Sequence, residues 1–381
     1  MISGSIFCAA LVIGVTFSNS AYSIEFKAKN MILLDETSRS IMFSRNADEK
    51  VAPAALTKLM TLEVVFHALK TGSLSLETEF TVSEHAWRTG GAPSRTATMF
   101  AGLKTDISVD DLIRGVTVHA ANDAAIILAE GMAESEAAFA ERMNERAAAI
   151  GLTQSRFTNP TGFEDPEMVV TVDDLARLAL HIIEEYPEYM GYFSEPEFTW
   201  NKIRQTNKNP LVKQDIGVDG FFLGWAEGNG FAIALTAKRD DQRIVGIMHG
   251  LASKKEREAE AKRMIDWAYQ SFTPRILFDE GEQVARARVF GGSSTHVPLL
   301  GNGAVSILVP NGIDERIRAR VVYEGPVRAP VSKGQPIGHV EIWRDDVRAQ
   351  LTPLYAASDV PVGGLTRRAV DGAQELLFGY W

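Results

Sequence analysis

The sequence predicts a mixed domain of helices and sheet, of the α/β or α+β class, followed by a smaller all-β domain. Strand hairpins are predicted near both ends of the first domain, with helical segments between them. After Phe272, short β-rich runs alternate with Gly and Pro turns. With 381 residues, the chain is long enough for two hydrophobic cores.

The sheet of the first domain is predicted from two hairpins. Each consists of two apolar runs around a four-residue polar turn, 31–35 with 40–44 and 231–238 with 243–248. A buried helix is predicted from Ala54 to about Leu69, because the apolar run follows Pro53 and ends at Gly72. These elements together predict a sheet edged by hairpins and covered by helices.

Further helices are predicted from residues that cap helix N-termini. The proposed starts are Ser108 with Asp111, Asn122, Ser135, and Thr171 with Asp174. Residues 254–272 predict a charged amphipathic helix. Its inner face is expected to consist of Ala261, Met264, Ile265 and Ala268.

The second domain is predicted over residues 274–360, with the first domain over 24–273. Its strands are expected at 284–290, 304–309, 317–323, 337–343 and 350–355. The tail 361–381 predicts an amphipathic helix with apolar residues at helical spacing, namely Leu365, Ala369, Ala373, Leu376 and Leu377. Such a helix either lies on a membrane surface or docks on its own domain.

The N-terminus predicts export from the cytoplasm. Residues 6–17 form an apolar run of the length of a signal-peptide core, which predicts a signal peptide over 1–23 with cleavage near Ala21–Ser23. No Lys or Arg precedes the run, and a buried N-terminal element is the alternative. The only cysteine, Cys8, lies inside this run. A mature chain would therefore contain no disulfide or thiol nucleophile, which fits a bacterial periplasm.

Composition and histidine spacing exclude several classes of function. A net charge of -10 argues against nucleic acid as a partner, because phosphate binding needs a basic face. The seven histidines are scattered singly, without the spacing of a metal site. No glycine-rich phosphate loop is present. We therefore predict no metal and no cofactor.

The segment Pro53–Thr61 resembles a catalytic serine motif that lacks its serine. In the S-x-x-K arrangement, Ser and Lys lie three residues apart on one helix face, so that Lys can take the hydroxyl proton. Here Lys58 is present, but the position three residues earlier is Ala55. A methyl group cannot attack a carbonyl carbon.

The first 270 or so residues resemble the serine D-Ala-D-Ala carboxypeptidases, which are low-molecular-weight penicillin-binding proteins that trim peptidoglycan stem peptides. Besides Pro53–Thr61, the resemblance rests on Leu33–Glu36, Arg45–Asp48, Asn122–Ala125, Asn159–Gly162, Asn207–Leu211 and Val218–Gly220, in the family's order. It implies a penicillin-binding-protein/β-lactamase-like transpeptidase domain. Gly325-Pro326 and Ala329-Pro330 resemble turns of the family's C-terminal β-domain, whose terminal tail lies flat on the inner membrane.

The resemblance also implies two further motifs, and both depart from the family pattern. The S-x-N motif corresponds to Ala120-Ala121-Asn122, where only the Asn remains. The K-T-G motif, which engages the substrate's terminal carboxylate, corresponds to Phe222-Leu223-Gly224, where only the Gly remains. The expected site residues are therefore Ala55, Lys58, Ala120 and Asn122 for catalysis, and Phe222, Leu223 and Gly224 for substrate binding.

These departures predict a homologue without useful carboxypeptidase activity. Loss of the nucleophile in a comparable acyl-transfer enzyme costs about a million-fold in turnover, or about 8 kcal/mol of barrier. The chain is expected to bind peptidoglycan stem peptides, or proteins of cell-wall synthesis and hydrolysis, in the periplasm and at times at the inner membrane. The alternative is an active serine-type carboxypeptidase with an altered or residual mechanism.

Three of the residues have alternative structural interpretations. Lys58 could neutralise a nearby carboxylate, and Asn122 could cap the helix that starts there. His119 could supply a base or could simply be a packed side chain.

Overall fold

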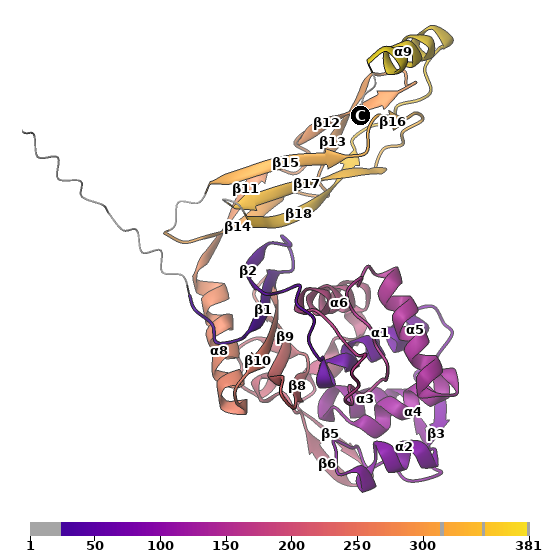
Figure 1. The fold of residues 1–381 in the computed structure, drawn as a ribbon, viewed down its shortest axis with the longest axis vertical. Helices are drawn as coiled ribbons and strands as arrows, with labels where there is room; N and C mark the ends of the chain where they lie inside the picture. Colours follow the sequence, from indigo (N-terminus) through magenta and orange to yellow (C-terminus); the bar gives the residue numbers. More distant parts are fainter. Residues whose placement is uncertain (1–23, 313–315, 345–346, 379–381) are drawn as a thin grey trace, which may run out of the picture.

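The computed structural model describes residues 24–312, 316–344 and 347–378. A helix-rich lobe and a β-rich lobe follow one another along the long axis of the molecule (Figure 1). The expected signal peptide, 1–23, lies outside the described residues. Within the described ranges, no helix combines the length and the apolar character needed to cross a bilayer.

The helix-rich lobe is built on an antiparallel sheet in the order β2-β1-β10-β9-β7, with β8 also paired to β9. Its strands are β1 (Asn30–Asp35), β2 (Ile41–Arg45), β7 (Val218–Gly220), β8 (Leu223–Ala226), β9 (Gly230–Arg239) and β10 (Gln242–Leu251). Both predicted hairpins, β1–β2 and β9–β10, are present. The sheet brings the two ends of the first domain together, because β1 pairs with β10.

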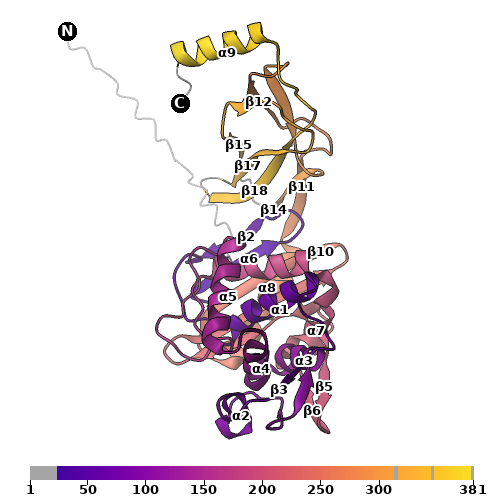
Figure 2. The same cartoon turned by 90° about the vertical axis from the view of Figure 1, so that its right-hand side faces the viewer.

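Helices cover both faces of this sheet (Figures 1 and 2). On one face, Ile32 and Leu34 of β1 join a core with α1 (Lys58–Lys70) and α6 (Val172–Glu185). On the other face, Met31 and Leu33 pack with α8 (Lys254–Gln270). Successive strand residues point to opposite faces, so a buried run such as β1 supplies both cores. The predicted inner face of α8 is buried.

Most of the predicted helix starts are confirmed by their caps. The side chains of Ser108, Ser135 and Thr171 accept backbone N–H bonds at the starts of α3 (Val109–His119), α5 (Glu136–Ala149) and α6. The helix predicted from Ala54 begins as a 3-10 turn, η1 (Ala54–Thr57), and continues as α1. The capping alternative for Asn122 is wrong, because α4 (Asn122–Ala133) is preceded by Ala121 and has no side-chain cap.

Shorter elements complete this lobe. They are β3 (Glu79–Thr81), α2 (Glu84–Thr89), η2 (Ala92–Ser94), β4 (Asp106–Ser108), η3 (Pro187–Tyr189), α7 (Gly191–Ser194), β5 (Glu197–Trp200), β6 (Ile203–Thr206) and η4 (Pro210–Lys213).

The β-rich lobe contains a sheet in the order β15-β17-β18-β13-β12-β16 and a separate pair, β11 with β14. The strands are β11 (Phe272–Phe278), β12 (Ala285–Phe290), β13 (His296–Leu300), β14 (Val305–Pro310), β15 (Ile317–Tyr323), β16 (Val327–Arg328), β17 (Pro336–Arg344) and β18 (Val347–Ala356). All five predicted strands are present. Sequence analysis missed β11, β13 and the short β16.

The terminal helix α9 (Leu365–Phe378) lies at the end of the β-rich lobe that is far from the helix-rich lobe (Figure 2). It contacts its domain through a polar residue, since Gly291 N donates to Asp371 Oδ2 at 2.8 Å. Leu365 is 82% exposed and Val370 is 46% exposed. The apolar residues are therefore not docked on the domain; Leu376 and Leu377 are outside the part whose side chains are described.

A buried serine joins the two lobes. Ser40, between β1 and β2, donates its hydroxyl to Gln350 Oε1 at 2.8 Å and accepts from Leu308 N at 3.2 Å. Arg344 donates to the carbonyl of Ile41 at 2.7 Å. The first hairpin is thus held by side chains or backbone from three strands of the β-rich lobe.

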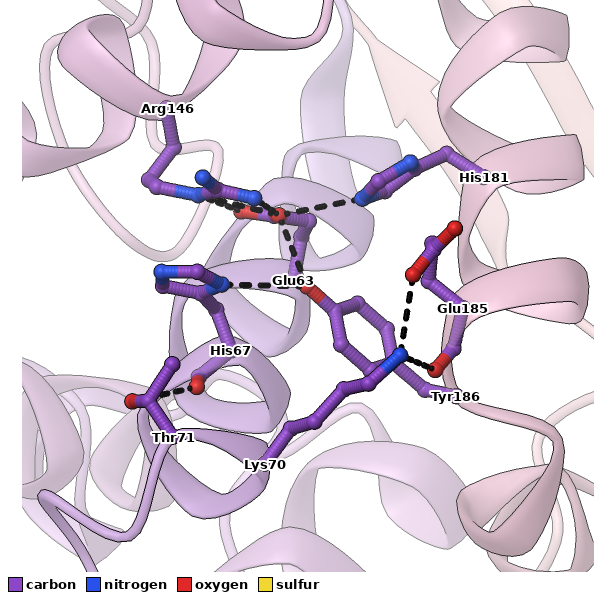
Figure 3. Close-up of polar contacts among 8 residues, drawn as sticks. All are labelled: Glu63, His67, Lys70, Thr71, Arg146, His181, Glu185 and Tyr186. Atoms are coloured by element: carbon purple, nitrogen blue, oxygen red, sulfur yellow. Dashed lines mark hydrogen bonds and ion pairs between the residues drawn. The ribbon is translucent and has the colours of Figure 1, made fainter.

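Glu63 fixes α1 to its neighbouring helices through a buried polar cluster (Figure 3). Its side chain is 0% exposed and lies 2.5 Å from Arg146 Nη2 of α5. The Tyr186 hydroxyl donates to the same Glu63 oxygen at 3.2 Å, and His181 Nε2 of α6 lies 3.4 Å from it. Burial acts to raise the pKa of the Glu63 carboxyl, but His181 and Arg146 outweigh it and hold the pKa below its ordinary value.

We predict that Glu63→Gln lowers the free energy of unfolding by about 3 kcal/mol, because it leaves the Arg146 charge without its partner. Glu185→Gln is the matched control: Glu185 pairs with Lys70, and both side chains are about half exposed, 51% and 46%. That exposed pair contributes less than about 1 kcal/mol. Urea unfolding of both variants measures the difference, and equal losses would contradict the prediction.

Candidate active site

Lys58 is the buried centre of the candidate site. It is the first residue of α1 and is 1% exposed. Its Nζ donates to Asn122 Oδ1 at 2.7 Å and to the carbonyl of Thr161 at 2.6 Å. Both acceptors are uncharged, and the nearby carboxylate of Asp123 acts on Lys58 through its charge rather than through a direct contact.

The environment favours the neutral form of this amine. Burial lowers the pKa of Lys58 from 10.5 to about 7, and the negative charge of Asp123 offsets only part of that effect. Lys58 therefore changes its protonation state near neutral pH.

Asp123 positions the second motif by holding a neighbouring loop. Its side chain is 0% exposed and accepts hydrogen bonds from Thr98 Oγ1 at 2.5 Å, Met99 N at 2.9 Å and Ala101 N at 3.1 Å. Burial raises the pKa of this carboxyl above its ordinary value. The adjacent Asn122 donates its Nδ2 to Thr96 Oγ1 at 3.0 Å, so its carbonyl oxygen is left to face Lys58.

The loop at Asn159–Gly162 supplies the other acceptor. Asn159 Oδ1 accepts from the backbone N–H of Thr161 at 3.2 Å and of Gly162 at 2.9 Å. Gly162 has φ +82°, and a Cβ there would lie 1.8 Å from the carbonyl oxygen of Ala54. Only glycine therefore lets this loop lie against η1 and carry the Thr161 carbonyl to Lys58.

A cavity of about 520 Å³ opens over these residues. Of the predicted site residues, its lining includes Ala55, Lys58, Ala120, Asn122 and Leu223. The first and second motifs and the middle residue of the third therefore meet in one place.

Phe222 and Gly224, which were predicted for substrate binding, are not among the residues that line this cavity. Phe222 is 2% exposed and packs edge-on against Phe193, with ring centroids 5.8 Å apart. It directly precedes Leu223, but Phe222 belongs to the core whereas Leu223 lines the cavity. Gly224 lies beside η1 instead: a Cβ there would lie 3.4 Å from the Pro53 carbonyl oxygen.

Sequence analysis missed a group of cations on the cavity wall, Lys208, Lys254 and Arg257. Arg257 Nη1 donates to the Gly224 carbonyl at 3.1 Å. Burial and the nearby charge of Lys254 lower the pKa of Lys208. Lys208 belongs to the segment Asn207–Leu211 that carried the resemblance, but Lys254 and Arg257 looked like ordinary polar residues of an amphipathic helix.

Trp225 extends the site beyond the first cavity. It is 58% exposed and borders both this cavity and a second one of about 1130 Å³. Gly162, Phe163 and Lys254 also border both cavities, so the two adjoin. His119 is not among the residues that line either cavity, and its pKa is lowered mainly by burial.

Known proteins match the chain over most of its length. The peptidase S11 family model, D-alanyl-D-alanine carboxypeptidase, matches residues 16–252. The chain belongs to the D-alanyl-D-alanine carboxypeptidase family. The model for the C-terminal domain of penicillin-binding protein 5 matches residues 272–362. The chain is therefore a penicillin-binding-protein-like member of peptidoglycan metabolism, with the fold that the sequence predicted.

Individual members of the D-alanyl-D-alanine carboxypeptidase family support this assignment. The chain is 32% identical over 378 residues to the carboxypeptidase DacA of Haemophilus influenzae, covering 96% of this chain and 95% of the relative. It is 33% identical over 347 residues to DacC of Escherichia coli, covering 90% of this chain and 87% of the relative. The crystal structure of penicillin-binding protein 5 from Haemophilus influenzae superposes with a TM-score of 0.76 and 33% identity, over 89% of this chain and 99% of that one.

The cleft of this family member provides donors and cations, and Ala55 and Ala120 place methyl groups on its wall. Asn122 and the cations can bind a peptide, and Lys58 can accept a proton. Within residues 24–312, 316–344 and 347–378, no three His, Cys, Asp or Glu side chains gather to hold a metal ion.

We predict that Lys58 makes the protein more stable as the pH rises from about 7 toward 10.5. Over this range the unfolded chain retains a proton that folded Lys58 has released. The free energy of unfolding therefore rises with pH by at most about 1.4 kcal/mol per pH unit. Lys58→Met should remove this contribution to the pH dependence of the free energy of unfolding. Urea unfolding of both proteins across this range measures it, and parallel pH profiles would contradict the prediction.

Proposed function

We propose that this family member binds peptidoglycan stem peptides in the periplasm without cleaving them. The observation that carries the proposal is the composition of the cleft. Its cavity, its Asn122–Lys58–Thr161 hydrogen bonds and its basic wall are in place, while Ala55 and Ala120 present methyl groups to it. Without a hydroxyl at residue 55, acylation by the family's route has no nucleophile.

The basic wall supports peptide binding. A stem peptide ends in a carboxylate, and Lys208, Lys254 and Arg257 offer cations to it on the cavity wall. Leu223 adds an apolar surface of the kind that would contact a D-alanine methyl group. Asn122 and the free backbone groups of β8, on the side away from β9, can hydrogen-bond peptide amides. The other class of partner that this cleft could bind is a protein of cell-wall synthesis or hydrolysis.

The second candidate function is D-Ala-D-Ala hydrolysis by an altered route. The names of the relatives, which are carboxypeptidases, favour it. The hydroxyl that touches the second motif is Thr96 Oγ1, which accepts from Asn122 Nδ2. Lys58 contacts the other end of the Asn122 amide, so it does not contact that hydroxyl as a base. Water activated by Lys58 remains as a slow route.

We predict that the purified protein binds diacetyl-L-lysyl-D-alanyl-D-alanine without releasing D-alanine and without labelling by fluorescent penicillin. Calorimetry measures binding, and chromatography measures release. Lys208→Ala should weaken binding about tenfold or more, because it removes a charge-assisted contact with the carboxylate. Lys255→Ala, on the exposed side of α8, is the matched control and should leave binding unchanged.

Ala55→Ser tests the reason for inactivity. With Leu223 at the third motif, we expect this single variant to remain far slower than its relatives. Release of D-alanine by the unaltered protein at a rate typical of its relatives would refute the binding role and support the second candidate. Binding of a cell-wall protein without binding of the tripeptide would reassign the partner.

We further propose that α9 makes a peripheral contact with the inner membrane. Its contact with the β-rich lobe uses Asp371, while Leu365 and Val370 are exposed. This orientation leaves apolar side chains free to enter the interface of a bilayer.

We predict that the protein co-sediments with vesicles of phosphatidylglycerol and phosphatidylethanolamine. Leu365→Glu combined with Val370→Glu should reduce the bound fraction several-fold, since it removes apolar area and adds negative charge. Ile276→Glu, at an exposed apolar residue of β11, is the control and should leave binding unchanged. Equal binding of all three proteins would exclude α9 as the contact.

A further inference from the structure

The hydrogen bonds of Lys58 leave one direction at its nitrogen unused. Nζ has two partners among the described residues, Asn122 Oδ1 and the Thr161 carbonyl, and both are acceptors. An ammonium group has three N–H donors, whereas a neutral amine has two donors and a lone pair. The two acceptors therefore match the donors of a neutral amine, and its lone pair occupies the remaining direction.

Of the side chains that line this cavity, only Thr161 carries a hydroxyl, and it donates to Asn159 Oδ1 at 2.9 Å rather than to the Lys58 nitrogen. Ala55 precedes Lys58 on the same helical face, and Ala120 lies beside Asn122. A serine at residue 55 could donate its O–H to the nitrogen. A methyl group can neither donate to the amine nor accept from it, so the amine keeps its nucleophilic electron pair.

At Lys58, burial outweighs the nearby negative charge and favours the neutral amine. Asp123 is the acid that acts on it, and the Asp123 oxygens are held by Thr98, Met99 and Ala101. The pKa of Lys58, about 7, leaves much of the amine unprotonated near neutral pH. An ordinary lysine is unprotonated in about one molecule in a thousand there.

The same cavity favours a small anion as the reaction partner. Lys208, Lys254 and Arg257 line it together with a single acid, Glu258. Glu258 is already engaged by Gln214 at 3.0 Å and by Lys262 at 3.8 Å. Within the described ranges, neither Lys208 Nζ nor Lys254 Nζ has a hydrogen bond or ion pair with a protein group. Their charges are therefore available to a carboxylate.

We propose that Lys58 forms a covalent imine with small carbonyl acids, in which an aldehyde or ketone group is bonded to a carboxylate. The Nζ lone pair attacks the carbonyl carbon, and a carbinolamine forms. Both amine protons then leave with the carbonyl oxygen as water, and a C=N bond replaces the C=O bond. The carboxylate lies against the basic wall. This reaction neither oxidises nor reduces the partner, and it requires neither peptide binding nor the absence of hydrolysis.

The test uses the full chain, glyoxylate as probe and sodium cyanoborohydride to reduce the imine to a stable carboxymethyl-lysine. Peptide mapping after a short reaction near neutral pH measures the modified fraction at each lysine. We expect modification at Lys58 at least about tenfold above that at Lys255, an exposed lysine on α8. Equal modification of the two, or modification confined to exposed lysines, would overturn the proposal.

Two variants separate the amine from the basic wall. Ala55→Ser adds one hydroxyl beside the amine and should lower modification of Lys58 several-fold while leaving Lys255 unchanged. Lys208→Ala should lower modification by glyoxylate but not by acetaldehyde, which has no carboxylate. Unchanged modification in Ala55→Ser would overturn the role of the free lone pair. Failure of the tripeptide to bind, which would refute the proposed function, does not alter any of these outcomes.

Discussion

The two hydrogen bonds of Lys58 determine the organisation of this cleft. They connect α1, α4 and the loop at Asn159–Gly162, which come from three separate parts of the chain. Each segment is held in place by another polar residue: Glu63 fixes α1, Asp123 fixes the start of α4, and Asn159 fixes the loop. A buried lysine is stable here because its donors meet fixed acceptors and because it can lose its proton. The cleft is therefore pre-formed rather than assembled by a ligand.

Local features of the fold were predictable from the sequence, because they depend on neighbouring residues. Capping residues at Ser108, Ser135 and Thr171 and the alternating pattern of the hairpins act over a few positions. Strands β11 and β13 were missed, and each contains a proline close to its middle, Pro274 and Pro298, which weakens the strand pattern. In the structure β11 pairs with β14 alone, where a missing donor is tolerated.

The motifs of the site were predictable from the sequence, but the directions in which some of its side chains point were not. The motifs predicted that four residues lie close together, namely Ala55, Lys58, Ala120 and Asn122, although up to 67 positions separate them in the sequence. All four line one cavity. The side to which Phe222 points depends on the register of a short irregular segment before β8, which no local signal records. Lys254 and Arg257 were missed because an amphipathic helix has many cations, and only tertiary packing shows which of them reach the cleft.

The aromatic packing around Phe222 bears on how this sequence could change over time. Phe222 and Phe221 both pack edge-on against Phe193, so the three rings form a unit. A single substitution to lysine at residue 222 would place a charge among these rings, and the neighbours would have to change with it. Introduction of a lysine at residue 222 is thus an epistatic problem, because its effect depends on which residues stand at positions 193 and 221. This stack therefore couples the residue at position 222 to the packing of the core.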